Sequence, residues 1–350
     1  MYKKYNRPVP KAPFFSIILP TYNRAHMLPG ALHTVLHQTF TDYEVLIVDD
    51  GGSDDTPEMI KSWTKDPRFK YKKVEHVGNM ACRNLALQMA TGTWITNIDS
   101  DDFWTLDRLQ VFADYIAAHP KAGFVFSNGY LHRFGRLIGM AFDPTRPIAE
   151  GKVPGHYAVG EEFLPYLTTN LAIPRALYQK YGHYRQDMII LDNELYARML
   201  ADGVEVGVIR KPLAVRRIHG GQVTHKWIEE YPEAVEALIA GGTPPEVLAA
   251  EKEKLVFEVA NYLWRNVEPE KARAFMLREL GEKAKTSKLY KRTFVPAPAL
   301  ALAKKAREWT LRLAHHPALA SADEKAIYAL IDPLIAEEAR LAKLKTGLGL

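Results

Sequence analysis

The segment EVLIVDDGGSDDT, Glu44–Thr56, joins a short apolar run to a cluster of acidic and glycine residues. An apolar run bounded by turn residues is typical of a strand buried on both faces. The Asp/Gly cluster predicts a tight loop, then an N-cap and a helix. The same order recurs in FFSIILPTYNR, Phe14–Arg24, and in TWITNIDSDD, Thr93–Asp102. Three predicted strands therefore carry polar residues at their carboxyl ends.

Helical patterns separate these strands and a fourth one. We expect strands at Phe14–Pro20, Glu44–Asp50, Thr93–Asp99 and Gly123–Gly129, with a weaker strand in FKYKKVE, Phe69–Glu75. We expect helices at Leu28–Gln38, Thr56–Thr64, Asn79–Ala90 and Leu106–His119. This alternation predicts an α/β fold with a Rossmann-like, mostly parallel sheet flanked by helices. Ligands of such sheets bind at the carboxyl ends of the strands.

The rest of the chain divides into three parts. No firm periodicity runs from Ser127 to about Glu162, and Leu164–Gly203 has a helical pattern. VEVGVIRKPLAVRRIHGGQ, Val204–Gln222, predicts a strand and a basic loop. From Lys226 long Ala/Leu/Glu/Lys segments predict an α-helical C-terminal region, 226–350, interrupted at GGTPPE, VPAPA and HHPALASAD. We expect a domain boundary near Thr224–Tyr231, and Met1–Pro13 is expected to be a loose lead-in.

Composition narrows the class of protein. The 350 residues are 47% hydrophobic and 25% charged, as in a soluble globular protein, and a formal charge of +5 is too small to indicate a nucleic-acid partner. Cys82 is the sole cysteine, which excludes an intramolecular disulfide and a cysteine-clustered metal site and favours a reduced, cytoplasmic location. Phe14–Leu19 is too short for a signal-peptide core, and no apolar stretch approaches the ~18 residues of a membrane span.

The acidic turn after the third strand allows two interpretations. Asp99 and Asp101 stand two positions apart, so both can face one hard cation such as Mn²⁺ or Mg²⁺. Alternatively the turn is only solvated, with Asp102 capping the next helix. Asp50 could accept a hydrogen bond from a nucleobase and Tyr22 could stack on one, or both could have a purely structural role. No single cluster decides between these readings.

The order and spacing of the clusters are more specific. SIILPTYNRAHMLPGALHTVLHQTFTDYEVLIVDDGGSDDT, followed by ACRNLALQMATGTWITNIDSDDFWTLDRL, resembles family 2 of the glycosyltransferases, which has the GT-A fold. The resemblance covers Phe14–Leu109 and, more weakly, continues to Gly220. It implies a GT-A domain at 14–225, with a nucleotide-sugar half at 14–125 and an acceptor half at 126–225. It also implies an inverting, metal-dependent transfer from a nucleotide-diphosphate sugar, usually a UDP-sugar, to a glycan or lipid-linked glycan.

The same resemblance assigns roles to individual positions. Tyr22 and Asp50 match residues that hold the nucleobase, Asp99 lies near the ribose and metal, and Asp101 is the principal metal ligand. RRIHGGQVT resembles a family segment whose histidine, here His219, is a further metal ligand in some members; a plain loop histidine is the alternative. The implied donor-binding set is Pro20, Thr21, Tyr22, Asn23, Asp50, Arg83, Asp99 and Ser100; for Arg83, packing on a helix face is the alternative. The acceptor side is expected at Glu150–Tyr178, where family members vary. By residue type alone, the candidate sugar contacts there are His156, Tyr157, Tyr166, Thr168 and Asn170. The expected acceptor-binding set is Thr169, Asn170 and Glu194.

A general base is expected in LDNELYARML. This segment resembles the family pattern E-D-x-D-L-x-x-R, in which the second residue is the base, here Asp192. Leu191 stands where the family commonly has Glu, which is a departure from the pattern. Glu194 is the rival base. If the segment is helical, Asp192 and Glu194 point in different directions, so only one of them can face the cleft. The structural alternative is an acidic helix face with an i,i+4 ion pair between Glu194 and Arg198.

The C-terminal region carries one further signal. Between Lys283 and Arg312 the acidic residue is Glu308 alone, against these bases: Lys283, Lys285, Lys288, Lys291, Arg292, Lys304, Lys305, Arg307 and Arg312. Interleaved apolar residues make this region amphipathic. It could contact the cytoplasmic face of an anionic inner membrane, where lipid-linked acceptors reside, or form a homo-oligomer or an internal packing surface.

Two other functions compete with the transferase. A non-catalytic nucleotide-sugar or glycan-binding module could retain the same fold, although retention of Asp99, Asp101 and a candidate base argues against it. A nicotinamide-dependent oxidoreductase would need G-x-G-x-x-G after the first strand, and LPTYNRAHMLPG lacks it. By analogy with the family, the expected pathway is synthesis of lipopolysaccharide, capsule or another bacterial surface polysaccharide.

Overall fold

A mixed β-sheet forms the centre of the molecule. The computed structural model describes residues 12–159, 164–188, 192–219 and 227–347. The strands are β1 (Phe15–Thr21), β2 (Tyr43–Asp49), β3 (Phe69–Lys73), β4 (Trp94–Asn97), β5 (Phe103–Trp104), β6 (Ala122–Arg133), β7 (Arg136–Met140), β8 (Leu171–Pro174) and β9 (Glu205–Arg217). In the part of the chain described, they form one nine-stranded sheet in the order β3-β2-β1-β4-β8-β6-β9-β5, with β7 paired to β6.

The two halves of the sheet differ in strand direction. β3, β2, β1 and β4 are all parallel, as the alternating strand and helix pattern predicts. β8 is antiparallel to both β4 and β6, whereas β9 is parallel to β6 and β5 is antiparallel to β9. The α/β prediction is confirmed, and antiparallel strands are added where the sequence pattern is weakest.

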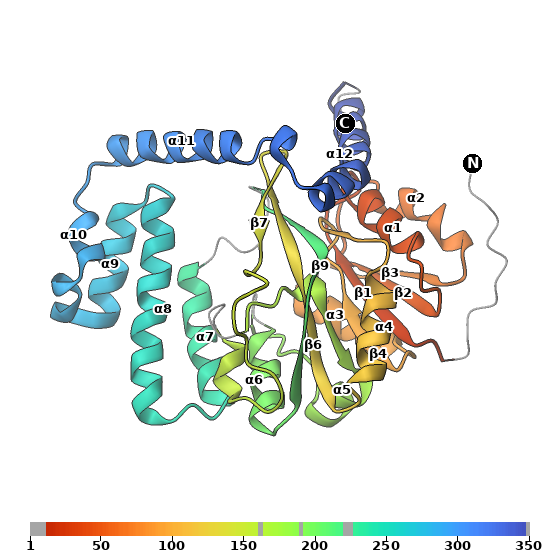
Figure 1. Ribbon diagram of the computed structural model, residues 1–350, viewed down its shortest axis with the longest axis horizontal. Helices are drawn as coiled ribbons and strands as arrows, with labels where there is room; N and C mark the ends of the chain where they lie inside the picture. Colours follow the sequence, from red (N-terminus) through yellow and green to blue (C-terminus); the bar gives the residue numbers. More distant parts are fainter. Residues whose placement is uncertain (1–11, 160–163, 189–191, 220–226, 348–350) are drawn as a thin grey trace.

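Helices cover both faces of the sheet (Figure 1). In the first two-thirds of the chain they are α1 (Leu28–Leu36), α2 (Thr56–Ile60), α3 (Asn79–Met89), α4 (Arg108–Ala118), α5 (Arg175–Tyr181) and α6 (Asn193–Ala201). Alternate β1 residues face opposite layers: Ile17 packs in the cluster that holds α1 and α4, and Ile18 in the cluster that holds α3 and α6. Burial on both sides explains why β1 and β2 are almost continuously apolar.

Two sequence predictions are wrong in detail. The segment Ser127–Glu162 is not irregular throughout, because β6 continues to Arg133 and pairs with β7 in a hairpin. The stretch Leu164–Gly203 is not wholly helical, because β8 joins the sheet between β4 and β6. Both errors fall in the half of the sheet with mixed strand direction.

The predicted helical C-terminal region is confirmed. It contains α7 (Trp227–Ala240), α8 (Pro245–Arg265), α9 (Pro269–Leu280), α10 (Lys288–Arg292), α11 (Ala297–Ala314) and α12 (Ala322–Gly347). Apolar residues of α8 and α9 form a small core of their own. The domain boundary at Thr224–Tyr231 lies partly outside the described residues and stays a prediction. Among the described helices, none is long and apolar enough to cross a bilayer.

The last helix returns to the sheet. Figure 1 shows α11 leading from the α8–α10 group, past the β6–β7 hairpin, to α12 beside α1. Ile327, Tyr328 and Ile331 of α12 are buried against Phe103 of β5 and Val215 of β9. The chain's helical end is thus packed against the strands that border the acidic turn.

Candidate active site

Polar side chains meet at the carboxyl ends of β1, β2 and β4. Thr21 of β1 lies opposite Asp49 of β2 in the parallel register, and Ile18 lies opposite Asn97 of β4. The segments that follow these strands therefore leave the sheet at the same edge. Pro20 and Thr21 end β1 there. The Thr21 hydroxyl is buried and, among the described residues, has no hydrogen-bond partner.

Asp50 and Tyr22 line one side of this edge. The buried Asp50 carboxylate accepts hydrogen bonds from the backbone N–H groups of Val77, at 2.7 Å, and Gly78, at 3.1 Å. His76 Nδ1 lies 2.9 Å from its other oxygen. The Tyr22 ring, 45% exposed, stacks on His76 with 4.6 Å between centroids. Tyr22 and His76 together present an aromatic surface beside a carboxylate.

Backbone contacts hold the two loops together. Asn23, in a left-handed conformation with φ 52°, accepts hydrogen bonds from the N–H groups of Ser53 and Asp54 through its side-chain oxygen. A Cβ on Gly52 would lie 2.5 Å from that same oxygen. Gly51 has φ +77°, and a Cβ there would meet the Val74 carbonyl. Gly51 and Gly52 of VDDGG therefore allow the Val74 backbone and the Asn23 side chain to lie close to this loop.

Arginine side chains and an imidazole hold the acidic turn on several sides. The Asp101 carboxylate lies 2.9 Å from His219 Nε2 and 3.8 Å from Arg24 Nη2. Burial favours its neutral form, but the His219 hydrogen bond and the Arg24 charge outweigh it, so the pKa of Asp101 is lowered. Asp102 accepts a hydrogen bond from the Arg217 N–H at 2.9 Å. Burial and the charges of Asp101 and Asp99 raise the pKa of Asp102 well above its usual value.

Arg217 connects this turn to the C-terminal helix. Its Nε donates to the Asp101 carbonyl, its guanidinium lies 4.1 Å from the Phe103 ring centroid, and its Nη1 pairs with Glu338 of α12 at 2.5 Å. Both side chains of this ion pair are almost fully buried. A Cβ on Gly30 of α1 would lie 2.5 Å from Glu338 Oε1, so Gly30 leaves room for the glutamate.

Arg83 connects the acidic turn to the candidate base. It extends from α3 and donates from Nη2 to Asp99 at 2.7 Å. Its side chain is 4% exposed, and among the described residues its Nε and Nη1 have no hydrogen-bond partner. The Arg83 charge also acts on Asp192. A buried guanidinium with unpaired N–H groups beside the Asp99 carboxylate fits an anionic or hydroxyl-rich ligand.

Asp192 has a different environment. It precedes the first residue of α6, is 6% exposed, and accepts a hydrogen bond from the Thr168 hydroxyl at 3.0 Å. Burial raises the pKa of Asp192, while Arg83 and the Thr168 hydrogen bond oppose the shift. A carboxylate with a raised pKa is a stronger base than one in water. Leu191, the departure from the family pattern, lies outside the described residues, as does Glu161, a further alternative to Asp192 as the base.

The remaining predicted residues have structural partners. Glu194 forms the expected ion pair with Arg198, at 2.7 Å, and is buried. Asn170 donates to the Ser127 carbonyl and accepts from the Leu167 N–H. The Thr169 carbonyl accepts from Trp104 Nε1. Ser100 is buried within the acidic turn. Thr169, Asn170 and Glu194 thus support the fold next to Asp192, whatever contact they make with an acceptor.

A divalent ion has a partial donor set here. Among the described residues, no group of three or more His, Cys, Asp or Glu side chains is arranged to hold a metal. Asp101 and His219 nevertheless present a carboxylate and an imidazole 2.9 Å apart, and Mn²⁺ accepts both ligand types. The donor chemistry therefore fits a metal whose remaining ligands come from a bound substrate.

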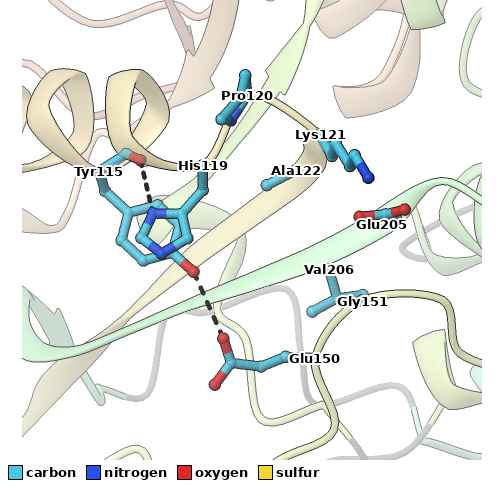
Figure 2. A pocket seen from close by; sticks show the side chains of 9 residues that line it. All are labelled: Tyr115, His119, Pro120, Lys121, Ala122, Glu150, Gly151, Glu205 and Val206. Carbon is cyan, nitrogen blue, oxygen red and sulfur yellow. Dashed lines mark hydrogen bonds between the residues drawn. The ribbon is translucent and has the colours of Figure 1, made fainter.

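The pocket in Figure 2 lies elsewhere. It has a volume of about 380 Å³ and is lined by Tyr115, His119, Ala122, Glu150 and Glu205, among others. Ala122 and Glu205 begin β6 and β9, so the pocket is at the edge of the sheet opposite the acidic turn. Its walls include a stacked Tyr115–His119 pair and a hydrogen bond from Tyr115 to Glu150. It contains none of the residues implied by the family resemblance.

Three residues of the site escape the sequence reasoning, and Thr168 is expected there only as a sugar contact, not as the partner of Asp192. Arg24 ends the quoted TYNR cluster without being given a role, and its charge next to an acidic turn is the signal that could have found it. His76 and Glu338 carry no local signal, because they reach Tyr22 and Arg217 from distant parts of the chain.

Comparisons with known proteins bear on the family resemblance and on the fold. Residues 16–138 match the family model described as Glycosyl transferase family 2, which confirms the resemblance over that segment. A Rickettsia conorii protein named "Uncharacterized glycosyltransferase RC0461" is 36% identical over 118 residues, covering 34% of this chain and 19% of that protein. The Escherichia coli UDP-Glc:alpha-D-GlcNAc-diphosphoundecaprenol beta-1,3-glucosyltransferase WfgD is 30% identical over 132 residues, covering 37% of this chain and 51% of WfgD.

A solved structure extends the likeness to most of the chain. The mannosyltransferase PcManGT from Pyrobaculum calidifontis, in complex with GDP-Man and Mn²⁺, has a TM-score of 0.53 at 20% identity, covering 94% of this chain and 87% of PcManGT. This likeness confirms the GT-A-like fold class. By sequence, the chain spans about a fifth of the Rickettsia relative and about half of WfgD.

Proposed function

We propose that this chain, which carries a family 2 glycosyltransferase segment at residues 16–138, transfers a sugar from a nucleotide-diphosphate donor to a hydroxyl of a glycan or lipid-linked glycan. The observation that carries the proposal is the nearness of two sites. Arg83 contacts Asp99, which follows β4, and Thr168, which donates to the buried Asp192, precedes β8, whose start pairs with the end of β4. Donor-binding and proton-accepting groups thus border one region.

The donor is proposed to bind between the first two loops. Tyr22 and His76 offer a stacking surface for the base, and Asp50 keeps acceptor capacity for a base N–H. Pro20, Thr21 and Asn23 shape the loop beneath it, and Asp99 and Ser100 would face the ribose. WfgD is named for UDP-Glc, which supports a UDP-sugar, whereas PcManGT was solved with GDP-Man, so a GDP-sugar is the alternative donor.

A Mn²⁺ or Mg²⁺ ion is proposed at Asp101, with Asp99 and His219 as further ligands. When bound, it would neutralise charge on the departing nucleoside diphosphate. Arg24 lies close enough to Asp101 to meet the same phosphates. Support comes from the carboxylate and imidazole donors and from the Mn²⁺ in PcManGT.

Asp192 is proposed as the general base of an inverting reaction. It takes the proton of an acceptor hydroxyl while that oxygen forms a bond to the anomeric carbon. The bond from the anomeric carbon to the diphosphate oxygen breaks on the opposite face, and its electron pair leaves with the nucleoside diphosphate. The raised pKa of Asp192 makes it a better proton acceptor, and Thr168 holds the carboxylate in place.

The competing function is a nucleotide-sugar or glycan-binding module without turnover. Mass spectrometry of products from a panel of UDP-, GDP-, dTDP- and CMP-sugars, with Mn²⁺ and bacterial surface-glycan acceptors, separates the two. Transfer of one sugar, lost on addition of EDTA, supports the transferase. Saturable binding of a nucleotide sugar with no product from any donor would favour the module.

A further inference from the structure

The outer face of α11 is apolar and basic, and the described part of the chain leaves it uncovered. Along α11, whose residues are all described, Leu300 alone is buried. Leu302, Trp309 and Leu313 are 70%, 65% and 50% exposed. With Ala306 they recur at steps of four, three and four, so they form one stripe along the helix. We call Leu302, Ala306, Trp309 and Leu313 the α11 stripe.

Polar contacts fix the opposite face of α11 to the body. Lys304 donates to the Asn266 side chain at 3.3 Å, and Glu308 lies 4.0 Å from Arg133 of β6. The Arg312 guanidinium lies over the Phe134 ring at the β6–β7 turn. These contacts orient the helix, and the α11 stripe faces away from them. Figure 1 shows α11 along one margin of the molecule.

The charge around the stripe selects its partner. Lys305 and Arg307 are exposed on the same helix, and Lys288, Lys291 and Arg292 are exposed on α10 just before it. Phe294 and Leu319, in the segments before and after α11, are 61% and 74% exposed. A second copy of the chain would place its own basic side chains against those of the first copy, and the like charges would repel. An anionic lipid surface instead attracts the bases while the Trp and Leu side chains enter its interfacial region.

We propose that the α11 stripe and its flanking bases bind the surface of an anionic bilayer, with α11 lying parallel to the membrane plane. The apolar side chains insert to the depth of the lipid headgroups, and the exposed Lys and Arg side chains contact the phosphates. This attachment does not depend on the proposed transferase activity. It would keep the chain at the surface where lipid-linked substrates reside.

Flotation of the full chain with vesicles tests the proposal. One vesicle type contains phosphatidylcholine alone, and the other an equimolar mixture with phosphatidylglycerol. The expected result is flotation with the anionic vesicles, weakened by salt, and little with the neutral ones. Leu302→Ser with Trp309→Ser, and separately Lys305→Glu with Arg307→Glu, should each reduce the bound fraction at least about tenfold.

Ile239→Ser is the matched control, because Ile239 is also apolar and 56% exposed but lies on α7. It should float as the unaltered chain does. Circular dichroism confirms that each variant keeps its helices. Flotation that is equal for all variants, or absent with both vesicle types, overturns the proposal. A dimer in sedimentation that the Leu302/Trp309 variant dissociates would also overturn it, in favour of a second copy. No donor or acceptor is present, so failure here leaves the transferase proposal untouched.

Discussion

Asp101 of the acidic turn and the candidate base Asp192 are both carboxylates, but they are held in opposite ways. Asp101 lies beside Arg24 and His219, and Arg217, which donates to the Asp101 carbonyl, pairs with Glu338 of the last helix. Despite burial the pKa of Asp101 is lowered, whereas Asp192 is buried beside a threonine hydroxyl and its pKa is raised by burial. The His219 hydrogen bond and the nearby arginine charges keep the Asp101 carboxylate charged and fixed, as ligand binding requires. Burial makes a carboxylate basic, as proton abstraction requires.

The largest effect is expected at the base itself. Asp192→Asn keeps the shape and the Thr168 contact but removes the proton acceptor, so kcat should fall about a thousandfold. Donor binding, measured by calorimetry, should be unchanged. Asp202→Asn is the control, since Asp202 is an exposed acid near the other end of the same helix. Undiminished turnover in Asp192→Asn would pass the role to Glu194 or Glu161.

The second largest effect is expected at the buried Arg217–Glu338 ion pair, which supports the acidic turn. Glu338→Gln leaves the buried Arg217 without its countercharge, which should reduce the free energy of unfolding by about 3 kcal/mol. Nucleotide binding in Mn²⁺ should weaken as well, because Arg217 holds the Asp101 carbonyl. The control is Glu337→Gln, which breaks an exposed pair with Arg340 and should cost under about 0.5 kcal/mol. Equal unfolding midpoints for the two variants would show that α12 does not brace the turn.

A smaller effect is expected at the aromatic side of the donor site. Tyr22→Ala removes one ring of the Tyr22–His76 stack, and nucleoside diphosphate binding should weaken about tenfold. Tyr22→Phe keeps the ring and should bind as the unaltered chain does. Calorimetric titration measures both. A loss in Tyr22→Phe equal to that in Tyr22→Ala would mean that the hydroxyl, rather than stacking, holds the base.

The smallest effect concerns pH. The Thr168 hydrogen bond stabilises charged Asp192 and so lowers its pKa. Thr168→Val should therefore raise that pKa further and move the acidic limb of the kcat profile to higher pH, by less than about one unit. Activity is lost as pH falls through the pKa, because the protonated acid cannot accept a proton. Thr168→Ser should retain the original limb. A limb that moves to lower pH in Thr168→Val would contradict the assignment.

The sequence predicts the parallel half of the fold, and the edge at which its polar residues gather, for a local reason. β1, β2 and β4 carry both their apolar runs and the polar residues that follow them, so Thr21, Asp50 and Asp99 can be placed without knowing the rest of the chain. The β6–β7 hairpin was missed because its turn uses Phe134 at φ 55° and Gly135 at φ 73°. Phenylalanine rarely adopts that conformation, and FG is no common hairpin signal.

The contacts that support the site could not be predicted from local sequence, because they join residues that are far apart along the chain. Glu338 lies 121 residues from Arg217, and Thr168 lies 24 residues from Asp192. No periodicity or spacing links such pairs, since they meet only after the sheet and α12 have packed. The burial that raises the pKa of Asp192 is likewise a property of the assembled fold.

Calorimetric titration of the nucleoside diphosphates UDP, GDP and dTDP tests the contrast between the two carboxylate sites most directly. With Mn²⁺, the unaltered chain and Asp192→Asn should bind one of them equally well, and EDTA or Asp101→Asn should reduce that binding at least about tenfold. Binding that is indifferent to EDTA and to Asp101→Asn, or that disappears in Asp192→Asn, would contradict the account.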